Sequence, residues 1–169
     1  MSFPPIVVPS PERERWLNQH VPYRMKMLDG LRAFVENGGR NGPLEAVFPS
    51  IFEGALIACR WSGNFLGLRV SRDGALCPVN RRHRRGGDVF SIDLGGTPVD
   101  PNSLNKSEAA LLRCVLLGAD VATAHATREG IHTMGWADVR STAPLLIGQI
   151  KLHLYDVLSL PVPEWKRPG

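Results

Sequence analysis

The sequence predicts a mainly α, single-domain helical bundle around a buried central helix at about 105–127, with a small antiparallel β element around 65–95. Three observations predict this class. The stretch 105–127 is apolar on almost every side, other stretches repeat apolar residues at helical spacing, and strand-like alternation is confined to the middle of the chain. With 169 residues, the chain can bury a sizeable core without disulfide bonds.

The predicted central helix has a clear start and a wide apolar surface. Asn105 can cap its first turn while Glu108 reaches back to the amide of the capping residue. One apolar stripe comprises Leu112, Val115, Leu116, Ala119, Ala122 and Ala126, and the opposite side carries Cys114, Leu117, Val121 and Ala124. Such a helix must be covered on several sides, so we expect only the strip with Arg113 and Asp120 to face solvent.

Three helical stretches are predicted before this helix. Residues 1–9 are rich in proline and are expected to be extended. The Ser-Pro pair at 10–11 is typical of a helix start, and Pro22 is expected to stop or kink that helix. The helical period resumes over 23–37, and a further helix is predicted over 49–61.

The β element is predicted from alternation and turn residues. Residues 66–70 and 75–79 alternate apolar and other side chains, and the Ser-Arg-Asp-Gly sequence at 71–74 can join them as a hairpin. Similar alternation over 89–94 predicts a third short strand. These strands would form a small sheet with one face packed on the helices.

A last helix is predicted near the end of the chain. It is expected to start at residue 141 or 142, to accept Pro144 in its first turn, and to end at about Leu160. Two prolines close to the end of this helix favour its termination, and residues 161–169 are predicted to form a C-terminal tail.

The composition indicates a soluble, cytoplasmic protein. No uncharged apolar run approaches the length of a membrane span, and the N-terminus resembles no targeting signal. The three cysteines, Cys59, Cys77 and Cys114, are an odd number without paired spacing, which favours a reducing compartment. Both chain ends contain apolar and proline residues that a second subunit could cover, so a homodimer is also expected.

The most distinctive local feature is a basic loop made of Arg81, Arg82, His83, Arg84 and Arg85. The chain has 20 Lys and Arg against 16 Asp and Glu, and four of the arginines lie in this loop, so the remainder is balanced. Clustered guanidinium groups repel one another, which predicts an exposed loop able to bind phosphates or carboxylates. The leading hypothesis is therefore a non-catalytic binding or regulatory protein that contacts an anionic partner, either an acidic protein surface or nucleic acid.

Two observations leave that hypothesis open. A charged loop can simply keep a sheet edge from aggregating. The loop also lacks interleaved aromatic residues for stacking on single strands, because the alternation around Phe90, the nearest aromatic residue, predicts a core position.

The sequence carries no catalytic or cofactor motif that we can recognise. It has no GxSxG, no GxxxxGK[ST] and no dinucleotide-binding fingerprint. Glu129 and His132 have the spacing of one di-metal motif, but that pattern would be needed twice. We therefore predict no catalytic residues, no metal and no cofactor, and enzymatic activity is the less favoured class.

An alternative site is predicted where two helices meet around Pro22. His20, Tyr23 and Arg24 could line a pocket there, which His125 could reach from the end of the central helix. This arrangement would suit a small enzyme or a small-ligand-binding protein. The competing interpretation is a packed corner between helices, with His125 bonded to the last carbonyl groups of its own helix.

Overall fold

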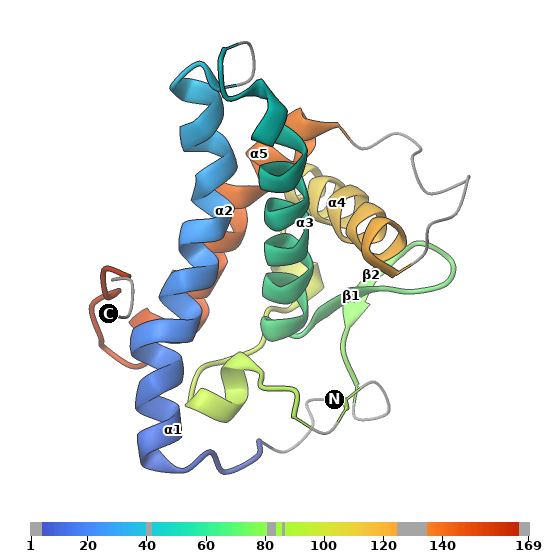
Figure 1. Cartoon of the computed structure of the whole chain (residues 1–169). Coiled ribbons are helices and arrows are strands. Elements are labelled where there is room, and N and C mark those ends of the chain that lie inside the picture. Colours follow the sequence, from blue (N-terminus) through green and yellow to red (C-terminus); the bar gives the residue numbers. More distant parts are fainter. Residues whose placement is uncertain (1–4, 40–41, 81–83, 86, 125–134, 166–169) are drawn as a thin grey trace.

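A computed structural model describes residues 5–39, 42–80, 84–85, 87–124 and 135–165, without side chains for 121–124. The chain is mainly helical with one small antiparallel sheet, which confirms the predicted class. α1 (Ser10–Arg15) and α2 (Val21–Glu36) form one long rod, and α3 (Phe48–Phe65) lies beside it. Figure 1 shows α3 between that rod and α4, with α5 behind.

Pro22 does not end the first helix. The chain continues from α1 into α2 through a π-helical turn, Trp16–His20, in which the Val21 amide donates to the carbonyl of Trp16. Proline has no amide hydrogen, so it cannot join the usual ladder of hydrogen bonds between a residue and the fourth one before it. The wider turn accommodates this loss and keeps the rod continuous.

α4 (Lys106–Ala124) begins as the sequence predicts. The Glu108 amide donates to the Asn105 side chain at 2.9 Å, and the Glu108 carboxylate accepts the Asn105 amide at 3.0 Å. The face toward α3 and α5 is buried and comprises Leu112, Val115, Leu116 and Ala119. The helix is less enclosed than its composition indicates, because Leu117 is 44% exposed. The predicted continuation at 125–127 lies outside the described residues.

α5 (Trp136–Ile150) starts earlier than predicted. The Asp138 carboxylate accepts the Gly135 amide at 2.8 Å and thereby caps the first turn, which places Pro144 inside the helix rather than at its start. A π-helical segment, Lys151–Asp156, follows directly, so helical structure ends before Leu160. Within this segment the buried Tyr155 hydroxyl donates to the Leu17 carbonyl at 2.7 Å and joins the first and last helical segments of the chain.

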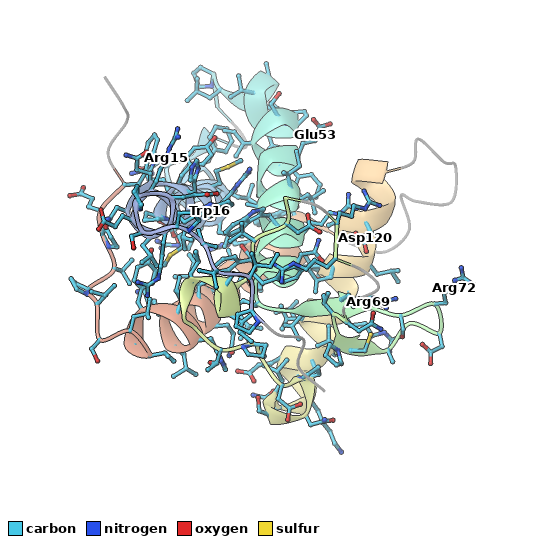
Figure 2. The ribbon with its side chains drawn as sticks, turned by 90° about the horizontal axis from the view of Figure 1, so that it is seen from below. Arg15, Trp16, Glu53, Arg69, Arg72 and Asp120 are labelled. Atoms are coloured by element: carbon cyan, nitrogen blue, oxygen red, sulfur yellow. The ribbon has the colours of Figure 1, made fainter. Side chains whose placement is uncertain are left out.

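The sheet contains two strands, β1 (Leu68–Val70) and β2 (Leu76–Pro78), in antiparallel register with Arg69 opposite Cys77. The predicted turn is confirmed, since the Gly74 amide donates to the Ser71 carbonyl at 3.0 Å. Figure 2 shows Arg72 at the outer end of this hairpin.

The predicted third strand is wrong. Residues Ser91–Leu94 form a short 3₁₀ helix, because the Asp93 carboxylate accepts the Phe90 amide at 2.8 Å and closes a helical turn. Gly95, with φ of 89°, then ends it. The alternating residues Phe90 and Leu94 are nevertheless buried, and Leu94 belongs to the core.

The core consists of side chains that α2, α3, α4, α5 and β1 bury together. α3 contacts α2, α4 and α5, and the hairpin packs against α3 and α4. Outside the core, Trp165 lies against Tyr23, with their ring centroids 5.2 Å apart, so the C-terminal segment folds back onto α2. None of the described helices is long and apolar enough to cross a membrane.

The backbone at Gly96, after the 3₁₀ helix, packs tightly on the π-helical segment that follows α5, and this contact predicts an effect on stability. A Cβ at Gly96 would lie 2.5 Å from the His153 carbonyl oxygen and 3.0 Å from that of Ser91. Gly96→Ala should lower the free energy of unfolding in urea by about 1–3 kcal/mol, because the backbone has to separate.

Gly30→Ala is the matched control, because nothing lies within 4 Å of a Cβ at that position in α2. It should raise the free energy of unfolding by about 0.5–1 kcal/mol through the better helix propensity of alanine. Equal stability of the Gly96 variant and the wild type would show that this contact is not tight.

Candidate functional site

The candidate site is built on a buried carboxylate, Asp93, whose side chain is 0% exposed. One oxygen accepts the Ile6 amide at 2.7 Å, and the other accepts the Phe90 amide and the Arg84 guanidinium. Burying a carboxylate is costly unless hydrogen bonds and an opposite charge compensate for the lost hydration. Asp93 therefore joins the N-terminal segment, the basic loop and the 3₁₀ helix at one point.

Of the two described residues of the basic loop, Arg84 is the one that points inward. Its side chain is only 10% exposed, its guanidinium pairs with Asp93, and its Cζ lies 5.0 Å from the centre of the Phe90 ring. It also donates to the Asp88 carbonyl at 3.2 Å. The expectation that all of these arginines are exposed is therefore wrong for Arg84, because a buried carboxylate holds it inside. Arg81, Arg82 and His83 lie outside the described residues.

Arg85 points the other way and is exposed. The Asp88 carboxylate accepts the Arg85 amide at 2.7 Å, and the Asp88 amide donates to the Arg85 carbonyl at 3.1 Å. This tight turn passes through Gly87, whose φ of 91° is unfavourable for other residues. The turn fixes the backbone from which the Arg85 side chain extends.

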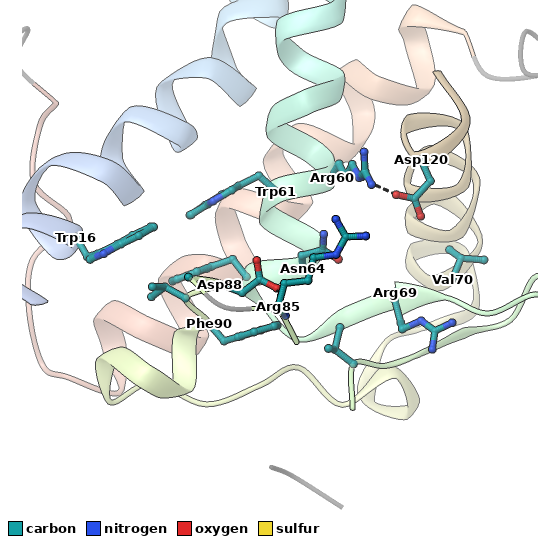
Figure 3. Close-up of a pocket in the computed structure, with 14 residues that line it drawn as sticks. Trp16, Arg60, Trp61, Asn64, Arg69, Val70, Arg85, Asp88, Phe90 and Asp120 are labelled. Atoms are coloured by element: carbon teal, nitrogen blue, oxygen red, sulfur yellow. Dashed lines mark hydrogen bonds and ion pairs between the residues drawn. The ribbon is translucent and has the colours of Figure 1, made fainter. Parts of the chain in front are cut away.

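Arg85 extends into a cleft of about 410 Å³ between α3, the hairpin and residues 87–90. Figure 3 shows Arg60 and Asn64 on α3, Arg69 on β1 and Arg85 on the turn around this space. The lining residues are Trp16, Arg60, Trp61, Asn64, Phe65, Arg69, Val70, Val79, Arg85, Gly87, Asp88, Val89, Phe90 and Asp120. Segments far apart in the sequence thus meet in one concave site.

Three arginines and two aspartates determine the charge of the cleft. Arg60 on α3 pairs with Asp120 on α4 at 2.8 Å, with both side chains partly exposed, so solvent screens this pair. Asp88 is committed to the turn that carries Arg85. Cationic groups outnumber anionic groups around the cavity, and this excess favours an anionic ligand.

One wall of the cleft is aromatic. The rings of Trp16 and Trp61 are nearly parallel, with an interplanar angle of 6° and centroids 6.3 Å apart. Trp61 also stacks on Phe65, with ring centroids 4.8 Å apart. Helical spacing accounts for part of this arrangement, because Trp61 and Phe65 are one turn apart on α3. Phe90 lies on the turn side of the cleft beneath Arg84.

The predicted pocket residues near Pro22 lie behind this aromatic wall. His20 packs on Trp16 with ring centroids 4.9 Å apart, and the Arg24 guanidinium lies 5.7 Å from the Trp61 ring centre. Tyr23 contacts Trp165 and Arg24 instead. None of these three residues lines the cleft, and Tyr23 is exposed, so the predicted pocket at this corner stays a prediction. His125 is outside the described residues.

The environment of His20 favours its neutral form. Partial burial, followed by the positive charges of Arg15 and Arg24, lowers the pKa of His20 below its usual value of 6.5. At neutral pH the ring is therefore uncharged and acts as a packing partner of Trp16.

Other reactive groups lie apart from the cleft. Burial raises the pKa of the Cys59 thiol to about 12, so this cysteine is a protonated core residue at neutral pH. Among the residues that the structure describes, no three His, Cys, Asp or Glu side chains are grouped to hold a metal ion. Glu129 and His132 lie outside the described residues.

The sequence identified Arg85 but missed the other cleft residues. Only tertiary packing of the π-helical turn after α1, of α3 and of β1 brings Trp16, Trp61, Arg60 and Arg69 to Arg85. The one available signal was that Arg60 and Arg69 interrupt apolar stretches, which a purely buried helix or strand would not need.

Comparisons with known proteins do not assign this chain to a class. It matches no protein-family model, no curated protein and no solved structure. The geometry of the cleft is therefore the basis for inferring a function.

The pairing of Arg84 with Asp93 makes a prediction about stability. Arg84→Ala should lower the free energy of unfolding by about 3–5 kcal/mol, because it leaves a buried carboxylate without its counter-charge. Arg32→Ala is the control, since Arg32 belongs to an exposed network with Asp29 and Glu36 and should change stability little. Urea denaturation measures both, and equal losses would contradict the special role of Asp93.

Proposed function

We propose that this protein is a non-catalytic binding protein whose cleft receives an anionic group of its partner. One observation carries the proposal: Arg60, Arg69 and Arg85 come from three separate segments and line the same concave space. Guanidinium groups bind phosphates and carboxylates through paired hydrogen bonds, and a concave site reduces competition from water. The basic loop then contributes through Arg85, while Arg84 anchors the loop from inside.

The chemistry of the lining residues supports binding rather than catalysis. The described residues around the cleft include no serine, cysteine, histidine or tyrosine that could act as a nucleophile beside a base. Asp120 pairs with Arg60, and Asp88 holds the turn. Both carboxylates therefore have structural partners.

The cleft is also the site that we propose for the small-ligand alternative, in place of a pocket at His20, Tyr23 and Arg24. His20 and Arg24 contact the cleft residues Trp16 and Trp61. A cytoplasmic location and a homodimer accompany the proposal as expectations from the sequence. An acidic protein surface and a nucleic acid both supply suitable anions.

Isothermal titration calorimetry with inorganic tripolyphosphate tests this proposal. Arg85→Ala and Arg69→Ala should each weaken binding by about 10- to 100-fold, because a charge-assisted hydrogen bond contributes roughly 1.5–3 kcal/mol. The affinity should also fall as salt is added, since the interaction is between charges.

Arg72→Ala is the matched control, because Arg72 is an exposed arginine at the outer end of the hairpin (Figure 2) and does not line the cleft. The Arg72→Ala variant should bind tripolyphosphate with the same affinity as the wild type. If all three variants bind equally well, or if the Arg72 variant loses as much affinity as the others, the cleft is not the anion site.

A further inference from the structure

We infer that the anionic group is the phosphate of a nucleotide, whose base stacks on the indole wall of Trp16 and Trp61. This inference rests on the proposed function and specifies its ligand. The cleft combines two kinds of surface that a simple anion site does not need together: guanidinium groups and parallel aromatic rings. A nucleotide has one group for each, because its base is planar and its phosphate is charged.

The aromatic wall is suited to a flat ring. Trp16 is only partly buried although it lies against Trp61, so part of its surface remains accessible beside the cleft. Trp61 contacts both Phe65 and Arg24, which restrict the motion of its ring. A base that stacks on a supported indole gains contact area without the entropic cost of ordering that side chain.

The polar groups continue from this wall toward the hairpin. Arg60 is the neighbour of Trp61 on α3, and Asn64 follows Arg60 by one helical turn, with its side chain exposed. Figure 3 shows Arg85 directed toward Asn64 from the opposite side of the cleft. An amide that offers both donors and an acceptor can bond a base edge, while Arg85 and Arg69 bind the phosphate.

The size of the cleft limits the ligand to a small unit. A volume of about 410 Å³ lies within the usual range for small-molecule sites, roughly 300–1,000 Å³. A double helix exposes its phosphates but keeps its bases stacked, so it cannot place a base on the indoles. An acidic peptide satisfies the arginines but makes no use of the aromatic wall. The ligand is therefore a free nucleotide or one nucleotide of a single strand.

Calorimetry on the wild-type protein with four ligands tests the inference. The ligands are adenosine 5′-monophosphate, ribose 5-phosphate, inorganic tripolyphosphate and a short single-stranded oligoadenylate. Adenosine monophosphate should bind at least about tenfold more tightly than ribose 5-phosphate, because only the former has a base to stack. Stronger binding of the oligoadenylate than of the monophosphate would identify a single strand as the source, and equal binding would identify the free nucleotide.

Two substitutions locate the base. Trp16→Ala should weaken the binding of adenosine monophosphate by about tenfold and leave the binding of tripolyphosphate unchanged. Trp16→Phe should retain most of the affinity for adenosine monophosphate. Trp136→Ala removes an indole that does not line the cleft and should have no effect. The comparison of ligands on the wild type does not depend on the stability of any variant.

The outcomes separate this inference from the proposed function. If adenosine monophosphate and ribose 5-phosphate bind equally, and Arg85→Ala weakens both, the cleft binds anions but the nucleotide inference is overturned. If none of the four ligands binds, both the inference and the proposed function are overturned.

Discussion

The cleft depends on the burial of one charge. Asp93 is withdrawn from water, and its hydration is replaced by two backbone amides and the Arg84 guanidinium. Because an uncompensated carboxylate would be very costly there, the three segments that supply these donors are fixed relative to one another. The backbone of Arg85 follows directly from Arg84, so the same pair that anchors the loop also positions the exposed arginine at the cleft.

α3 connects this anchor to the bundle. One side of the helix is buried in the core with Ala55, Leu56 and Cys59, while Arg60, Trp61 and Asn64 lie toward the cleft. Close packing of α3 against α4 is possible because Gly63 has no side chain where Leu116 lies. That approach brings Asp120 within reach of Arg60. The apolar core and the polar cleft are thus two faces of the same helix.

Local signals predicted the parts of the fold that local interactions determine. The cap formed by Asn105 and Glu108 and the turn before Gly74 involve neighbouring residues, and both are present as predicted. The helix through Pro22 was missed because a π-helical turn is not visible in apolar spacing. The strand predicted around Asp93 was wrong because a side-chain hydrogen bond closes a helical turn there.

The site was harder to predict because its residues come together through contacts between segments far apart in the sequence. The run of arginines indicated a binding role for Arg84 and Arg85. Their adjacency in the sequence did not predict that Arg84 would be largely buried and Arg85 exposed. The aromatic residues that the basic loop lacks are supplied by α3 and by the turn before α2, and only tertiary packing brings them close. These aromatic residues therefore cannot be recognised from the sequence of the loop.

The most direct test of the account is a nuclear magnetic resonance titration of the ¹⁵N-labelled protein with tripolyphosphate. The account predicts shifts of the side-chain N–H signals of Arg69 and Arg85, which line the cleft. The indole signals of Trp136 and Trp165 should stay in place. Shifts confined to those two tryptophans, or no shift at any cleft residue, would contradict the claim that this cleft is the binding site.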